Sequence, residues 1–131
     1  MRNRPEVAHQ MRSLAALGVH FSVADFGSSY SCLSHLHQLP VSTLKIDCSF
    51  VERVSDPNGT YTIVQAIIAL AHGLGLRVVA EGVQRADQME CLRTLGCDGL
   101  QGSLLASVLP AASIPKYLVP AAPPVAKHSR R

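Results

Sequence analysis

The sequence lacks a long hydrophobic run, although 47% of its 131 residues are hydrophobic and only 16% are charged. A helix needs roughly 20 consecutive apolar residues to cross a bilayer, and no segment approaches that length. The N-terminus, Met1–Pro5, is basic but is not followed by the apolar segment of a secretory signal. We therefore expect a single globular domain in the cytoplasm, with no membrane partner.

The sequence also lacks paired cysteines. Its four cysteines include no C-x-x-C pair, and none has a histidine at zinc-finger spacing. A structural zinc site and a disulfide framework are both unexpected, and we predict buried free thiols instead, because free cysteine is among the most buried residue types. The four are Cys32, Cys48, Cys91 and Cys97.

An extended basic surface is lacking as well. The formal net charge is +3, and Lys127, Arg130 and Arg131 lie within the last five positions. The rest of the chain is balanced, which argues against nucleic acid as a partner. Residues 119–131 are rich in proline and alanine before they become basic, and we predict a disordered tail there.

Hydrophobic periodicity indicates an alternation of helices and strands with short connections. This order is typical of a parallel α/β sheet, and we predict about four βα units. The expected helices cover residues 5–17, 30–39, 60–74, 86–95 and 110–118, and the expected strands cover residues 19–25, 43–47, 76–80 and 97–100.

Polar side chains occur where each predicted strand ends. They are Asp25, Lys45 with Asp47, Glu81 and Gln101. In a parallel sheet all of these would lie on one rim, where three acids, a lysine and an amide can hold metal ions and orient a phosphoryl group. The alternative is that these residues only cap strands.

Other motifs point to structural roles or to no site. Asp25-Phe26-Gly27 spells the kinase metal-binding triplet, but the phosphate loop and catalytic loop of kinases are missing. We expect His72 to stabilise a helix C-terminus and Asp98 to lie in a turn. Arg85 is left open between a phosphate contact and a surface ion pair.

Four ordered motifs resemble the second half of the EAL domain, the cyclic di-GMP phosphodiesterase module of bacterial signalling proteins. Residues 24–33 (ADFGSSYSCL) resemble D-D-F-G-[TS]-G-Y-S-S-L, and residues 39–47 (LPVSTLKID) are similar to L-P-V-D-x-L-K-I-D. Residues 79–83 (VAEGV) are similar to V-A-E-G-V-E, and residues 96–102 (GCDGLQG) to G-C-D-x-x-Q-G.

The resemblance implies a partial TIM-like (β/α) barrel that hydrolyses cyclic di-GMP to linear pGpG with Mg²⁺ or Mn²⁺. It places Asp25 and Glu81 at the metal site and assigns catalytic roles to Lys45 and Glu81. It assigns Gln101 and Asp47 to substrate binding.

The sequence departs from the family where the chemistry needs ligands. The Glu-Ala-Leu strand and two further metal ligands of the family precede the matched region, and Ala24 stands where the family has the first of two aspartates. We therefore expect residues 1–118 to be the C-terminal half of an EAL-type domain, either a fragment or a remnant, in which metal and cyclic di-GMP binding are weakened and catalysis is lost.

Two other hypotheses remain open at this point. Open sheet edges favour pairing with another chain, so a homodimer or a non-enzymatic module that binds cyclic di-GMP or a protein is the first alternative. A small doubly wound, flavodoxin-like domain is the second, because four βα units also suit that fold.

Overall fold

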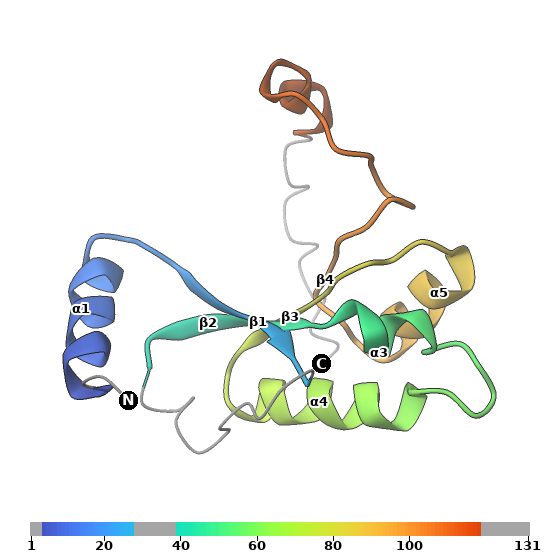
Figure 1. The fold of residues 1–131 in the computed structure, drawn as a ribbon, viewed down its shortest axis with the longest axis horizontal. Helices are drawn as coiled ribbons and strands as arrows, with labels where there is room; N and C mark the ends of the chain where they lie inside the picture. Colours follow the sequence, from blue (N-terminus) through green and yellow to red (C-terminus); the bar gives the residue numbers. More distant parts are fainter. Residues whose placement is uncertain (1–3, 28–38, 119–131) are drawn as a thin grey trace, which may run out of the picture.

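In the computed structural model, the described residues are 4–27 and 39–118, and they form a parallel α/β unit (Figure 1). Its helices are α1 (Arg4–Ala16), α3 (Cys48–Glu52), α4 (Tyr61–Gly73) and α5 (Ala86–Thr94), followed by the 3₁₀-helix η1 (Ala111–Tyr117). Its strands are β1 (Phe21–Phe26), β2 (Val41–Ile46), β3 (Arg77–Ala80) and β4 (Gly99–Leu100).

The four strands are parallel and lie in the order β1-β2-β3-β4, which confirms the predicted sheet. Their carboxyl ends are level, because the last residues of the strands pair in succession across the sheet. These residues are Phe26, Ile46, Ala80 and Leu100. The residues that follow the strands therefore start from one common edge.

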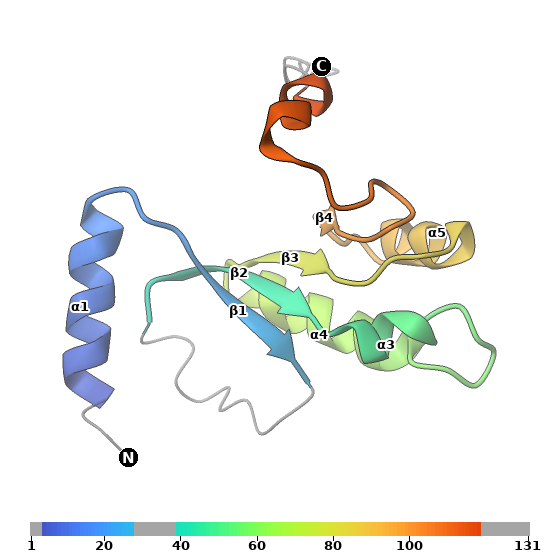
Figure 2. The ribbon, with the colours of Figure 1, turned by 45° about the horizontal axis from the view of Figure 1, so that its top comes forward.

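The core lies between the sheet and the helices that cover one of its faces (Figure 2). Leu44 and Ile46 alternate with exposed or half-buried neighbours on β2, and Val78 and Ala80 do the same on β3. On α4 the buried residues recur at helical spacing, as expected for an amphipathic helix. They are Val64, Ile67, Ile68 and Ala71, and Leu92 of α5 joins the same core.

Two elements differ from the sequence prediction. The short helix α3 was not predicted, since five residues are too few to show helical periodicity. Asp47 caps it, and its buried Val51 anchors it to the core. Residues 111–117 form a 3₁₀-helix where a helix over 110–118 was expected, and Pro115, which lacks an N–H and clashes with the preceding turn, disfavours the α form.

The two ends of the described chain leave apolar side chains uncovered. Helix α1 lies beyond the starts of β1 and β2, and the segment after β4 leads away from the sheet (Figures 1 and 2). Leu17 on the α1 side and Val108 on the other are largely exposed, and further large apolar residues are exposed to a lesser extent. These are Val7, Leu14, Leu105, Ile114, Tyr117 and Leu118.

The cysteine prediction is wrong for Cys48, which is exposed because it lies at the start of α3 on the rim. Cys91 and Cys97 are half-buried, and burial, the largest influence, raises the pKa of the Cys97 thiol. Three predictions concern residues outside the described ranges: Cys32, the helix over 30–39 except for its last residue, and the tail over 119–131. None of the described helices is long and apolar enough to span a membrane.

His72 and Asp98 form a contact at the opposite end of the sheet from the rim. His72 Nε2 lies 2.9 Å from Asp98 Oδ2, which also accepts from the backbone N–H of Val78 at 2.7 Å. Burial works against the charged Asp98 carboxylate, but these two hydrogen bonds outweigh it and lower the Asp98 pKa. The pair thus ties the end of α4 to the starts of β3 and β4.

Candidate functional site at the carboxyl ends of the strands

The polar residues predicted for the rim follow the level strand ends. The backbone N–H of Glu81 donates to the carbonyl of Ile46 at 3.1 Å, and that of Gln101 donates to Ala80 at 2.9 Å. The backbone hydrogen bonds between the parallel strands therefore continue for one residue beyond β3 and β4. This extension fixes the backbone from which the Glu81 and Gln101 side chains leave.

Lys45 joins the side chains of Glu81 and Gln101. Its Nζ lies 2.5 Å from Glu81 Oε1 and donates to Gln101 Oε1 at 3.2 Å. The Lys45 and Glu81 side chains are 26% and 21% exposed, so the pair is open to a ligand yet partly shielded from water. The cluster of Lys45, Glu81 and Gln101 offers a cation and a carboxylate together, which suits a phosphate ester and the proton transfers at it.

The strand pattern explains why these three side chains meet. Lys45 lies between Leu44 and Ile46, both fully buried on the helix-covered face, so its side chain leaves the opposite face of the sheet. The register pairs Lys45 with Val79, and Glu81 lies two residues further along the same face. A side chain as long as that of lysine can span this offset.

Asp47 lies on the same rim, but its carboxylate caps helix α3. Asp47 Oδ1 accepts from the backbone N–H of Ser49 at 2.9 Å and from Ser49 Oγ at 2.5 Å. These two bonds, led by the hydroxyl, lower the pKa of Asp47. The observed contacts of Asp47 are thus those of a helix cap, and its predicted role in substrate binding stays a prediction.

Asp25 lies in a β-bulge beside this cluster. Val23 pairs with Leu44 and Phe26 with Ile46, so two residues of β1, Ala24 and Asp25, stand opposite one residue of β2. That residue is Lys45. Asp25 also has a φ of 53°, in the left-handed region that aspartate tolerates better than most residues. A bulge of this kind redirects side chains at the end of a strand, and here it leaves Asp25 exposed, one residue before the level strand ends.

The described residues do not form a metal site by themselves. Over residues 4–27 and 39–118, no three His, Cys, Asp or Glu side chains lie close enough to hold one ion. A two-metal centre requires several fixed carboxylates, whereas Glu81 is engaged by Lys45 and Asp47 by Ser49. A divalent ion at this rim would therefore need ligands from other residues.

Close backbone packing holds the segments behind the rim. A Cβ on Gly102 would lie 2.0 Å from the carbonyl oxygen of Val83, and one on Gly82 would lie 2.6 Å from the Cβ of Cys48. The backbone N–H of Val83 in turn donates to the Gln101 carbonyl at 3.0 Å. Only glycine fits such approaches, so the segments that follow β2, β3 and β4 are packed against one another.

Several residues near the site were missed or left open by the sequence analysis. Arg85 forms an ion pair with Asp87, Nε to Oδ1 at 3.1 Å, which favours the surface ion pair over the phosphate contact. Gln88 is almost fully buried, yet the sequence marks it only as a polar residue in the first turn of a helix. Ser49 and Gly102 were likewise not identified, because their roles depend on tertiary contacts.

Comparison with known proteins gives one consistent result. The sequence model of the EAL domain matches residues 1–107. The bifunctional diguanylate cyclase/cyclic di-GMP phosphodiesterase MucR of Pseudomonas aeruginosa is 44% identical over 104 residues, which cover 79% of this chain and 15% of MucR. The cyclic di-GMP phosphodiesterase NbdA of the same species is 40% identical over 129 residues, which cover 95% of this chain and 16% of NbdA.

Solved structures agree with the sequence matches. A MucR phosphodiesterase in complex with c-di-GMP superposes with a TM-score of 0.78 and 42% identity, over 87% of this chain and 46% of that one. Klebsiella pneumoniae BlrP1, in a manganese/c-di-GMP complex, superposes with a TM-score of 0.70 and 27% identity, over 79% of this chain and 26% of that one. These matches overturn the flavodoxin-like alternative. The chain spans only about a sixth of the length of the curated relatives it matches.

Proposed function

Because the chain belongs to the EAL domain family, we propose that it supplies the C-terminal half of a cyclic di-GMP phosphodiesterase site and does not hydrolyse the nucleotide alone. The observation that carries this proposal is the cluster of Lys45, Glu81 and Gln101 at the carboxyl ends of β2, β3 and β4. In parallel barrels this end of the strands is where chemistry takes place.

In this proposal each residue at the rim has a separate role. Lys45 carries the positive charge that attracts a phosphate and positions the attacking water, and Glu81 holds the Lys45 ammonium in place. Gln101 fixes the Lys45 ammonium from a second side and offers an amide to the nucleotide. Asp47 keeps its cap on α3 and contacts the nucleotide from the next loop.

We also propose that metal binding is completed by residues of the N-terminal half of an EAL domain. Asp25 and Glu81 would each contribute one carboxylate to a Mg²⁺ or Mn²⁺ site, in keeping with the manganese in the BlrP1 complex. Ala24 contributes nothing to such a site, since a methyl group cannot bind a metal. A cytoplasmic location stays a prediction.

Calorimetry with cyclic di-GMP tests this division of the site. The chain is titrated alone and after mixing with a separately produced N-terminal half of an EAL domain, because a half site cannot enclose its ligand. We expect heat of binding in the mixture only, and its loss in Lys45→Met. Equal binding by the chain alone would overturn the proposal.

A second candidate function is association with another protein chain. The uncovered apolar residues of α1 and of residues 104–118 support it, as do β1 and β4 at the two edges of the described sheet. In this proposal the chain is a non-enzymatic module, and a homodimer is its simplest form. Light scattering that gives a monomer mass at all concentrations would count against it.

A further inference from the structure

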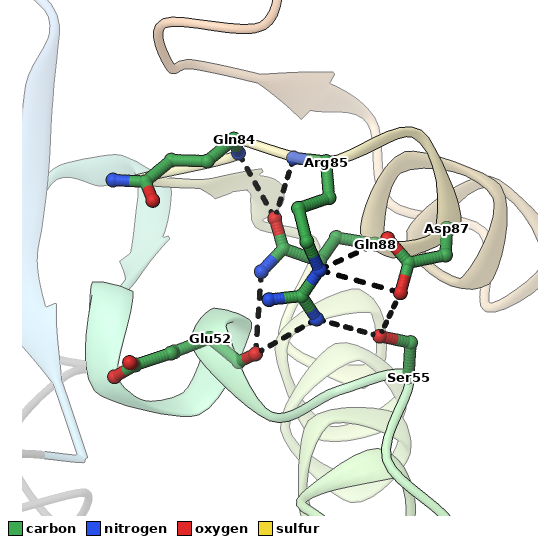
Figure 3. Close-up of polar contacts among 6 residues, drawn as sticks. All are labelled: Glu52, Ser55, Gln84, Arg85, Asp87 and Gln88. Carbon is green, nitrogen blue, oxygen red and sulfur yellow. Dashed lines mark hydrogen bonds and ion pairs between the residues drawn. The ribbon is translucent and has the colours of Figure 1, made fainter.

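A buried amide lies behind the rim, on helix α5. Gln88 is 1% exposed, and all of its polar atoms have partners. Its Oε1 accepts from the backbone N–H groups of Gln84 and Arg85, at 2.9 and 3.0 Å, and its Nε2 donates to the carbonyl of Glu52 at 3.2 Å (Figure 3). Burying an amide costs free energy unless each group is bonded, so this residue is strongly committed to one arrangement.

Arg85 reinforces the same connection from the surface. Its guanidinium donates to the Glu52 carbonyl at 3.2 Å and to Ser55 Oγ at 3.0 Å (Figure 3). Asp87 accepts from Arg85 Nε at 3.1 Å and from the Ser55 hydroxyl at 2.6 Å. The carbonyl of Glu52, at the end of α3, therefore receives two donors, one from Arg85 just before α5 and one from Gln88 in the first turn of α5.

The two segments joined here are those that follow the site residues. Helix α3 begins three residues after Lys45, and Gln84 lies three residues after Glu81. The close approach of Gly82 to Cys48 shows that the two segments are already in contact next to the rim. Hydrogen bonds to Glu52 therefore restrain how far the backbone of Glu81 can move from β2.

We propose that Gln88, supported by Arg85, is a positioning residue that keeps Glu81 within reach of Lys45. The functional importance of this role rests on the proposed function, but the geometric role does not. The simplest alternative is a helix cap, because Gln88 is the third residue of α5 and accepts from the N–H of the residue before the helix. A cap requires only Oε1, whereas the bond from Nε2 to Glu52 serves the connection to α3.

Gln88→Glu separates these two roles. The carboxylate retains an acceptor for the N–H groups of Gln84 and Arg85 but has no donor for the Glu52 carbonyl. Gln88→Met removes both, and Arg85→Lys keeps the charge while it loses the planar fork. Glu90→Gln, an exposed change on the same helix, is the matched control.

The readout is the coupling free energy between Lys45 and Glu81, measured by a double-mutant cycle of Lys45→Met and Glu81→Gln in the full chain. In Gln88→Glu and in Arg85→Lys we expect this coupling to fall to roughly half or less of its value in the parent chain, and to stay unchanged in Glu90→Gln. Amide hydrogen exchange at Gln84 and Arg85 should remain slow in Gln88→Glu and become fast in Gln88→Met.

An unchanged coupling in Gln88→Glu, whatever the change in overall stability, would show that Gln88 is a cap only and would overturn the proposal. If Gln88→Met does not fold, the Gln88→Glu and Arg85→Lys cycles still decide. The cycle uses no nucleotide and no metal, so its failure is distinct from a failure of the proposed phosphodiesterase site.

Discussion

Lys45 of β2 and Glu81, the residue after β3, meet on the face of the sheet opposite the described helices, with 2.5 Å between Nζ and Oε1. Lys45 is opposite Val79, and Glu81 begins the segment that leaves β3 at the same rim. The contact therefore depends on the register of β2 with β3 and on the path of the chain after Ala80. Both are set by the core on the other face of the sheet.

The Lys45–Glu81 pair should contribute measurably to stability. Because each side chain is about three-quarters shielded from solvent, we expect a coupling of roughly 1 kcal/mol, above the typical value for fully exposed pairs. Urea unfolding of the parent chain, Lys45→Met, Glu81→Gln and the double variant gives this value. Additive effects of the two substitutions would contradict the contact.

Gly102→Ala should destabilise the chain by more than about 2 kcal/mol, as overpacking against a fixed backbone does. The added methyl group would lie 2.0 Å from the Val83 carbonyl oxygen. Gly73→Ala is the control, because nothing lies within 4 Å of its Cβ position at the end of α4. That change should be neutral or stabilise by up to about 1 kcal/mol. Equal urea midpoints for the two variants would exclude the close approach.

Stability should fall at acid pH in part through Asp87. A hydrogen bond from Ser55, the larger influence, and another from Arg85 lower the pKa of Asp87 to about 2. The folded state therefore binds fewer protons than the unfolded state between about pH 4 and pH 2, and the contribution is present above that window and lost as the pH falls through it. Urea midpoints over pH 2–5 should decline less steeply in Asp87→Asn than in the parent chain. Parallel declines would rule out this role, and Glu90→Gln controls for the loss of a carboxylate on α5.

Ala24→Asp should increase the capacity of the rim for divalent cations. The bulge sets residue 24 beside Asp25 and opposite Lys45, so a second carboxylate would stand next to the first. We expect tighter Mn²⁺ binding by electron paramagnetic resonance in Ala24→Asp than in the parent chain. Ala16→Asp, on the exposed end of α1, is the control for added negative charge. Equal binding by the parent chain and Ala24→Asp would mean that the bulge does not direct residue 24 to the rim.

The sheet and the Lys45–Glu81 cluster could be predicted from the sequence because both follow from alternation. The apolar residues of β2 and β3 define the buried face, and the polar residues between and after them must take the other face and the rim. Helix boundaries were found to within a few residues where glycine ends the helix, as at the end of α4.

Features that depend on contacts between distant segments could not be predicted. The bulge at Ala24–Asp25 depends on how β1 pairs with β2, and nothing in the local sequence marks it. Asp47 was expected to face a ligand, yet the observed contacts are a cap on a helix too short to show a pattern. The sequence shows Gln88 only as a polar residue within a predicted helix, and its burial depends on hydrogen bonds with two backbone N–H groups and one carbonyl.

The most direct test of the account is hydrolysis of cyclic di-GMP with Mn²⁺, followed by chromatography of linear pGpG. The chain and its Glu81→Gln variant are assayed alone and after mixing with the N-terminal half of an EAL domain, with complex formation checked by light scattering. We predict no product from the chain alone and product from the mixture that depends on Glu81. Product from the chain alone that Glu81→Gln abolishes would contradict the account, as would a mixture that forms a complex and yields no pGpG.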